Sequence, residues 1–252
     1  MCREMTSTMD YKGILKKAGA VLLALAFWQI VAMKLDSKIL LVTPVEVLKR
    51  LATIWKVQGF ATSIWFTFYH IISGYFLAII CGILFAILAS KWNIVETLLW
   101  PWVITIKTVP VASFIVICLI WMPVGGLSVF ISFLIVFPII YQNVLEGLRN
   151  RDAKLHEMAE VFCITWYKRM KYITMPKLKP FLMSALSVSC GMAWKAGVAA
   201  EIIGVPNGSI GKMLHNAKMY LATDDLLAWT VILVILSVAF EKVFMYIMSK
   251  VL

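Results

Sequence analysis

The sequence of 252 residues is 62% hydrophobic and 15% charged, whereas a soluble domain is nearer half apolar and a quarter charged. Apolar surface on this scale excludes a soluble globular fold, and continuous apolar runs of roughly twenty residues favour membrane helices over the alternating strands of a β-barrel. The net charge of +11 is concentrated beside these runs, as the positive-inside rule leads one to expect, and does not indicate nucleic-acid binding. We therefore predict an all-α polytopic membrane protein.

The N-terminal part is predicted to contain one crossing and one surface helix. The apolar run 14–33 is not followed by an A-x-A-like cleavage site, so an uncleaved anchor with a cytoplasmic N-terminus is favoured over a signal peptide. Thr43 and Pro44 form a helix-start signal, with the threonine as N-cap and the proline at the first position. The segment 44–57 that follows has an apolar face and is predicted to lie as an amphipathic helix on the outer surface.

Residues 63–90 are the second predicted crossing, and small residues recur in it at every fourth position. Side chains at this spacing lie on one face of a helix, where they let another helix approach closely. The same pattern recurs in the predicted crossing 177–200. The two stripes therefore predict close packing between helices. They comprise Gly74, Ala78, Gly82, Ala86, Ala185, Ser189, Ala193 and Gly197.

Prolines interrupt the third and fourth predicted crossings, 96–121 and 127–147. Pro101 and the Thr-Val-Pro segment 108–110 are predicted to break the third crossing, because proline removes a backbone donor and kinks a helix. Such breaks are tolerated in a membrane only where neighbours or water satisfy the freed carbonyl groups. Pro138 lies inside the fourth crossing.

With 224–248 as the last, six crossings are predicted in a single membrane domain, 1–252. Six crossings place both termini and the loop 149–176 on the same side of the membrane. Most of the Lys and Arg residues fall on this side, so it is predicted to be cytoplasmic. No soluble domain is expected beside the membrane part.

No stretch of the chain matches a catalytic or metal-binding motif. Asn207–Lys212 resembles part of a phosphate loop, but it lacks the first glycine and the Ser or Thr that GxxxxGK[ST] requires. His70, His156 and His215 form no metal-binding pair, and the five cysteines show no CxxC spacing. We expect no metal, no nucleotide site and no cofactor in this chain.

A charge inside a crossing is costly and is a functional candidate, and we single out Lys107, Lys195 and Glu201 on this ground. Lys107 and Lys195 either line a path for an anionic solute, or pair with a carboxylate or extend to the lipid headgroups. Both interpretations stay open. In the second interpretation, Glu201 is one carboxylate with which a lysine could pair. Trp194, beside Lys195, is grouped with these three as a candidate path residue by position alone.

The loop 149–176 is the longest polar passage of the chain. Two short helices are predicted in it, one from Asp152 through Cys163 and one from Thr165 to just before Pro176. Large apolar residues fall at helical spacing in both. A loop in contact with solvent alone would not need them, so this loop is predicted to dock into a groove of a partner.

The same loop resembles a known motif. The sequence EMAEVFCITWYKRMKYITMP is similar to the EAA loop of ABC importer permeases. Met158 replaces the first alanine of that motif, and Cys163 stands where the family usually has a glycine, although cysteine is penalised at positive φ and glycine is not. The matching positions are Glu157, Ala159, Ile173 and Pro176.

Further stretches, LVTPVEVL, IKTVPVASF and AWKAGVAAEIIG, resemble the nitrate/sulfonate/taurine-type permeases, and the resemblance covers about residues 40–250. It implies a type I ABC importer fold in a bacterial cytoplasmic membrane. It also implies a second permease chain, expected to form a homodimer, two ATPase subunits that bind ATP and Mg, and an extracytoplasmic substrate-binding protein. The residues implied at the ATPase contact are Glu157, Met158, Ala159, Phe162, Cys163, Trp166 and Pro176.

The expected function is therefore that of a transport subunit rather than an enzyme, and the two lysines favour a small anionic solute. Two alternatives remain. An ion-coupled secondary transporter would need acidic residues within its crossings, but the acids cluster at helix ends, with Glu201 as the exception. A non-transport membrane scaffold would not need helices interrupted by proline.

Overall fold

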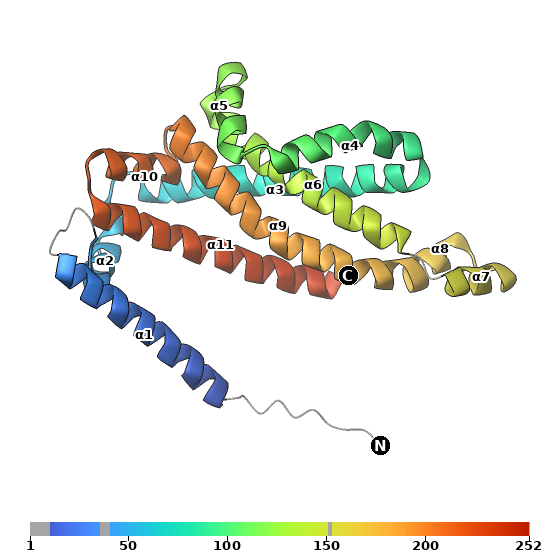
Figure 1. Ribbon diagram of the computed structural model, residues 1–252, viewed down its shortest axis with the longest axis horizontal. Helices are drawn as coiled ribbons and strands as arrows, with labels where there is room; N and C mark the ends of the chain where they lie inside the picture. Colours follow the sequence, from blue (N-terminus) through green and yellow to red (C-terminus); the bar gives the residue numbers. More distant parts are fainter. Residues whose placement is uncertain (1–10, 36–40, 151–152, 252) are drawn as a thin grey trace. The chain divides into compact units, whose positions relative to one another are not determined.

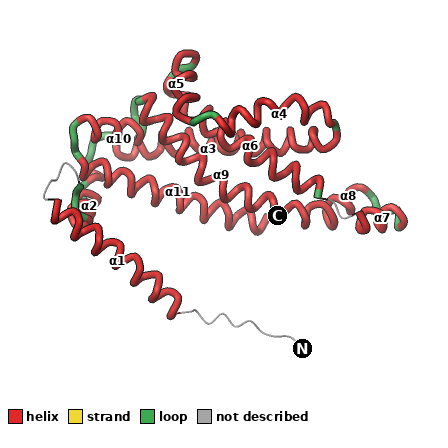
Figure 2. Tube along the Cα trace, viewed as in Figure 1, coloured by secondary structure: helices red, strands yellow, loops and turns green. Residues whose placement is uncertain are grey.

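The computed structural model describes residues 11–35, 41–150 and 153–251, and every regular element in them is helical (Figures 1 and 2). Two short 3₁₀ turns, Ile54–Lys56 and Val124–Gly126, and a π-helical turn, Met170–Thr174, accompany the α-helices. The α-helices are α1 Tyr11–Leu35, α2 Pro44–Leu51, α3 Phe60–Lys91, α4 Asn93–Thr108, α5 Val111–Trp121, α6 Leu127–Arg149, α7 Ala153–Val161, α8 Trp166–Arg169, α9 Met175–Gly204, α10 Ile210–Met219 and α11 Thr223–Val251.

The chain separates into two compact units. The smaller unit combines Met1–Val57 with Ala217–Ala228, and the larger unit combines Gln58–Asn216 with Trp229–Leu252. Helices α1 and α2 belong to the smaller unit, whereas α3 to α9 belong to the larger one. The loop 149–176 and both small-residue stripes therefore lie in the larger unit.

Four helical segments of the described chain are long and apolar enough to cross a membrane, and they are Phe60–Lys91, Val124–Arg149, Tyr167–Gly204 and Thr223–Lys250. The bent pair α4–α5 would make a fifth span. These findings confirm the all-α polytopic fold. The predicted crossing 14–33 lies within α1 and is not one of these four segments, so the count of six crossings stays a prediction.

Helices α3, α6 and α9 pack side by side in the larger unit (Figure 1). All eight residues of the two predicted stripes are buried. A Cβ added at Gly197 would lie 2.6 Å from Ile71 Cγ1 and 2.6 Å from Ser132 Oγ, so α9 approaches both other helices there. A Cβ at Gly82 would lie 2.9 Å from Ile140 Cβ. Small side chains are thus what permits these helices to approach so closely.

The third predicted crossing is broken at one of the two predicted points. Helices α4 and α5 meet at 110°, where Val109 and Pro110 both have extended backbones, with ψ of 133°. Proline disfavours the helical conformation of the residue before it, which accounts for this break. The interruptions predicted at Pro101 and Pro138 are wrong, because α4 continues through Pro101 and α6 continues through Pro138. Membrane helices tolerate an internal proline when other groups satisfy the freed carbonyl.

The helix start predicted at Thr43 and Pro44 is confirmed. Thr43 Oγ1 accepts a hydrogen bond from the N–H of Glu46 (3.3 Å), and the Glu46 carboxylate accepts from the N–H of Thr43 (3.4 Å), which is a capping box. The predicted helix 44–57 is interrupted, however. Helix α2 ends at Leu51, where Thr53 Oγ1 donates to Arg50 O (3.0 Å), and a 3₁₀ turn follows.

Candidate functional site

Helix α7 ends in a tight turn centred on Cys163. The N–H of Cys163 donates to Glu160 O (3.0 Å), and the N–H of Ile164 donates to Ala159 O (2.9 Å), the hydrogen-bond pattern of a Schellman turn. Cys163 has a φ of 49°, in the left-handed region that favours glycine. The cysteine therefore adopts the conformation for which a glycine would be expected. Asp152, the predicted cap of this helix, lies outside the described residues.

The second helix predicted in the loop does not end before Pro176, and this prediction is wrong. Helix α8 passes through the π-helical turn Met170–Thr174 directly into α9, so that Tyr167–Gly204 is one helical segment. The N–H of Met175 donates to Met170 O, and this local π register accommodates the proline that follows. The second half of the loop is therefore continuous with a membrane-spanning helix.

The loop presents large apolar side chains that the described chain leaves uncovered. Phe162 is 72% exposed and Val161 is 78% exposed, whereas Ala159 is only 2% exposed. Glu157, Met158, Cys163 and Pro176 are also exposed, while the side chain of Trp166 lies outside the described part. Figure 1 shows α7 and α8 projecting beyond the ends of α6 and α9. An apolar surface in this position suits a protein partner.

The two lysines predicted inside crossings are both exposed. Lys107 lies in the last turn of α4, directly before the break, and its Nζ donates to Gln142 Oε1 of α6 (2.7 Å). Lys195 lies on α9, and within the described chain no hydrogen bond or ion pair of its ammonium group is seen. Neither ammonium group is neutralised by a carboxylate of the described residues. Both cations are thus available to an anion.

Trp194 and Glu201 are instead enclosed by the chain. Trp194 is buried beside Phe68, with ring centroids 6.2 Å apart. The Glu201 carboxylate is fully buried, and its Oε2 accepts from Thr67 Oγ1 (2.7 Å) and from the N–H of Gly211 (3.2 Å). Thr67 Oγ1 in turn accepts from the N–H of Ile210 (2.9 Å). Glu201 therefore joins α9 to α3 and to the first turn of α10.

A second acid within a spanning helix was missed in the sequence. Glu241 lies inside α11, and its Oε1 accepts a hydrogen bond from Ser187 Oγ of α9 (2.7 Å). The single acidic residue within the apolar run 226–248 is the signal that marks it. Its partner is a hydroxyl group, so Glu241 contributes to the packing of α9 against α11.

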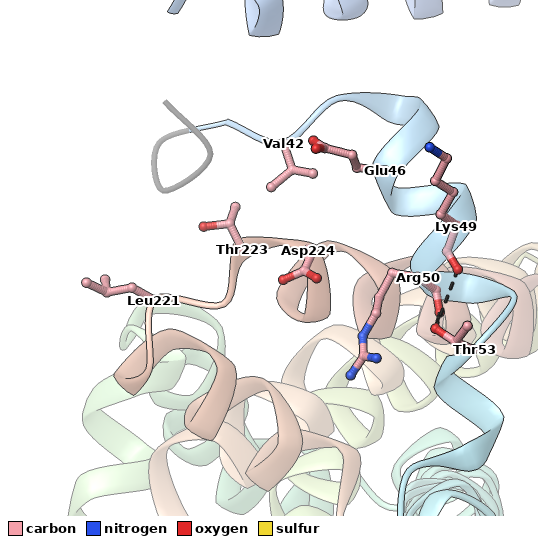
Figure 3. Close-up of a pocket in the computed structure, with 8 residues that line it drawn as sticks. All are labelled: Val42, Glu46, Lys49, Arg50, Thr53, Leu221, Thr223 and Asp224. Carbon is pink, nitrogen blue, oxygen red and sulfur yellow. Dashed lines mark hydrogen bonds between the residues drawn. The ribbon is translucent and has the colours of Figure 1, made fainter. Parts of the chain in front are cut away.

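The smaller unit contains a cavity of about 500 Å³ (Figure 3). Arg50 of α2 lies on its wall and pairs through Nε with Asp225 of α11. This hydrogen bond raises the pKa of Arg50 above its usual value. The pair holds α2 against the start of α11 within the smaller unit. The residues that line the cavity are Val42, Glu46, Lys49, Arg50, Thr53, Leu221, Thr223 and Asp224.

The comparison with known proteins identifies the family. Residues 54–252 match the model of the binding-protein-dependent transport system inner membrane component. The chain belongs to this family of membrane permease subunits, which are not enzymes. Among the described residues, no group of three His, Cys, Asp or Glu side chains is placed to bind a metal ion.

Two relatives show the same assignment. The chain is 26% identical over 224 residues to a permease protein assigned to aliphatic sulfonate transport, SsuC of Bacillus subtilis (strain 168), which covers 88% of this chain and 79% of that protein. It is 26% identical over 228 residues to the taurine transport system permease protein TauC of Escherichia coli (strain K12), which covers 88% of this chain and 82% of that protein. The predicted resemblance to sulfonate- and taurine-type permeases is thereby confirmed.

Proposed function

We propose that this chain is the permease subunit of an ATP-driven importer and that separate ATPase subunits dock on the loop 149–176. The observation that carries the proposal is the exposed apolar surface around Val161 and Phe162. The turn that follows this surface leads into the continuous helical segment Tyr167–Gly204, which includes α9. A displacement of the loop by closing ATPase subunits would therefore move a spanning helix directly, as in a two-state domain movement. ATP and Mg would be bound by those subunits.

The proposed solute is a small anion. Exposed ammonium groups facing lipid are costly, so Lys107 and Lys195 are better placed against a water-filled path. A second permease chain, in our proposal a copy of this one, would enclose that path. The aliphatic sulfonates and taurine named for the relatives above fit such a path, since the sulfonate group of each is negatively charged at any physiological pH. An extracytoplasmic binding protein would deliver the solute.

Co-isolation with the ATPase subunits tests the proposed coupling. Purification of the tagged chain from its host membrane should bring the ATPase subunits with it, and Phe162→Asp should abolish this by placing a charge in an apolar contact. Tyr220→Asp is the matched control, because Tyr220 is an exposed aromatic residue outside the loop. Retention of the ATPase by the Phe162 variant, or after deletion of residues 155–175, would disprove the proposal. Uptake driven by an ion gradient without ATPase subunits would favour a secondary transporter instead.

A further inference from the structure

Polar contacts connect both ends of α4 to α6. At the first end, the Arg149 guanidinium forms two parallel hydrogen bonds with the Glu96 carboxylate, from Nη1 to Oε1 (2.6 Å) and from Nη2 to Oε2. At the other end, Lys107 Nζ donates to Gln142 Oε1 (2.7 Å). The two contacts are about 16 Å apart along α4, at about 1.5 Å per residue. They join an antiparallel pair of helices at two separate points.

These contacts help to hold α4 against α6, because few side chains of α4 are buried. Val103 is the single buried residue of α4, whereas α3 buries residues along its whole length. The Arg149 contact has the planar, bidentate geometry that makes a carboxylate pair specific in direction. Glu96 lies in the first turn of its helix and Arg149 in the last turn of its own, so each charge is favoured by the helix dipole.

The position of the pair gives it a role beyond packing. Arg149 is the last residue of α6 and the first residue of the loop 149–176, which is proposed to contact the ATPase subunits. Glu96 lies at the opposite end of α4 from Lys107, which is followed at once by the break at Val109. A single rigid helix of 16 residues therefore connects the start of the loop to an exposed lysine at the bend.

We propose that Glu96 and Arg149 are positioning residues that transmit the displacement of the loop through α4 to Lys107. Closure of the ATPase subunits moves Arg149, the bidentate pair carries α4 with it, and the lysine end of α4 changes its position. This inference rests on the proposed function. The pair is partly exposed, so its contribution to stability is small. Removal of the pair should leave the protein folded, but the position of Lys107 should no longer respond to ATP hydrolysis.

The test measures how accessible the bend is in the two states of the complex. Thr108, next to Lys107, is exposed and is replaced by cysteine in a chain whose five native cysteines are replaced by alanine. The complex is purified with its ATPase subunits and treated with an anionic methanethiosulfonate reagent. The reaction rate is compared without nucleotide and with ATP, Mg and vanadate. In the parent complex, we expect the two rates to differ by about fivefold or more.

Four variants decide whether the pair transmits the change. Glu96→Gln and Arg149→Gln should each bring the ratio of the two rates close to one, while ATPase co-isolation stays unchanged. The charge exchange Glu96→Arg with Arg149→Glu should restore the ratio. Lys91→Gln is the control, because Lys91 is an exposed cation in the last turn of α3, and it should behave like the parent.

Three results would overturn the inference. They are a parent complex without any nucleotide-dependent change, single variants that keep the parent ratio, and a charge exchange that restores nothing. Each of these requires a complex that still contains its ATPase subunits. Failure of the proposed function is recognised separately, because the parent chain would then not co-isolate with an ATPase at all.

Discussion

Cys163 shows how one residue can satisfy a turn at a conformational cost. The Schellman turn requires a left-handed residue, and the sequence supplies a side chain there, with φ of 49°. A non-glycine residue in this region is disfavoured by roughly 1–2 kcal/mol. The hydrogen bonds to Glu160 O and Ala159 O offset that cost. The turn is thus formed by the surrounding geometry rather than by the preference of the cysteine.

Glycine at position 163 should therefore stabilise the turn. We expect Cys163→Gly to slow amide exchange at positions 163 and 164 by an amount corresponding to about 1 kcal/mol. The reason is that glycine is not penalised in the left-handed conformation. Hydrogen exchange of the purified chain, resolved to this peptide, measures the effect. Cys163→Ala is the control and should leave the exchange rate unchanged. Faster exchange in the glycine variant would show that the side chain stabilises the turn in another way.

Glu201 is a buried residue whose loss should destabilise the larger unit. Glu201→Ala leaves the Thr67 hydroxyl and the Gly211 N–H buried without an acceptor, so we expect a loss of about 2 kcal/mol in the free energy of unfolding. Glu201→Gln keeps one acceptor oxygen and should lose less. Thermal unfolding in detergent compares both with Glu157→Ala, an exposed carboxylate whose removal should change little. Equal stability of all three variants would contradict the assignment of Glu201 as a buried link between helices.

At the scale of the element, local signals in the sequence were sufficient for some features and insufficient for others. The start of α2 was predicted from Thr43 and Pro44, and the break before Pro110 from the proline itself, because each depends only on adjacent residues. Pro101 was wrongly predicted to break α4, since the outcome depends on which groups satisfy the freed carbonyl. The end predicted before Pro176 failed for a similar reason, because a π turn accommodated the proline.

The close approach of α9 to its neighbours can be tested with two glycines of the same helix. A Cβ at Gly197 would lie 2.6 Å from Ile71 Cγ1, whereas a Cβ at Gly191 would meet nothing within 4 Å. We expect Gly197→Ala to lower the free energy of unfolding by about 1–3 kcal/mol through overpacking. Gly191→Ala should leave it unchanged or raise it by up to about 1 kcal/mol, because alanine favours the helix.

The midpoint of thermal unfolding in one detergent, for both variants and the parent chain, provides the measurement. Similar midpoints for the two variants would mean that α9 can shift away from Ile71 without cost. The close packing of the stripe would then not be a determinant of stability.

At the scale of the whole molecule, the class of protein followed from composition and apolar runs, but the contacts that join its helices did not. Thr67 and Glu201 are 134 residues apart in sequence, Arg50 and Asp225 are 175 apart, and Glu96 and Arg149 are 53 apart. No periodicity in a single sequence pairs such residues, because each helix has several faces and many possible neighbours. The fold class was therefore predictable, while the roles of Glu201, Glu241 and Glu96 required the three-dimensional structure.

The exposed lysines lead to a prediction about transport by the complete complex. If Lys107 and Lys195 attract an anion, Lys107→Met and Lys195→Met should each reduce the uptake of labelled taurine or methanesulfonate by about tenfold, while ATPase co-isolation is preserved. Lys107→Arg and Lys195→Arg keep the positive charge and should retain most of the uptake. Proteoliposomes with the ATPase subunits and the binding protein measure this directly. Lys91→Met removes an exposed lysine at the end of α3 and is the control. Undiminished uptake in both methionine variants would exclude these lysines from the path. Their charges would then be explained by their position near helix ends and by contact with lipid headgroups.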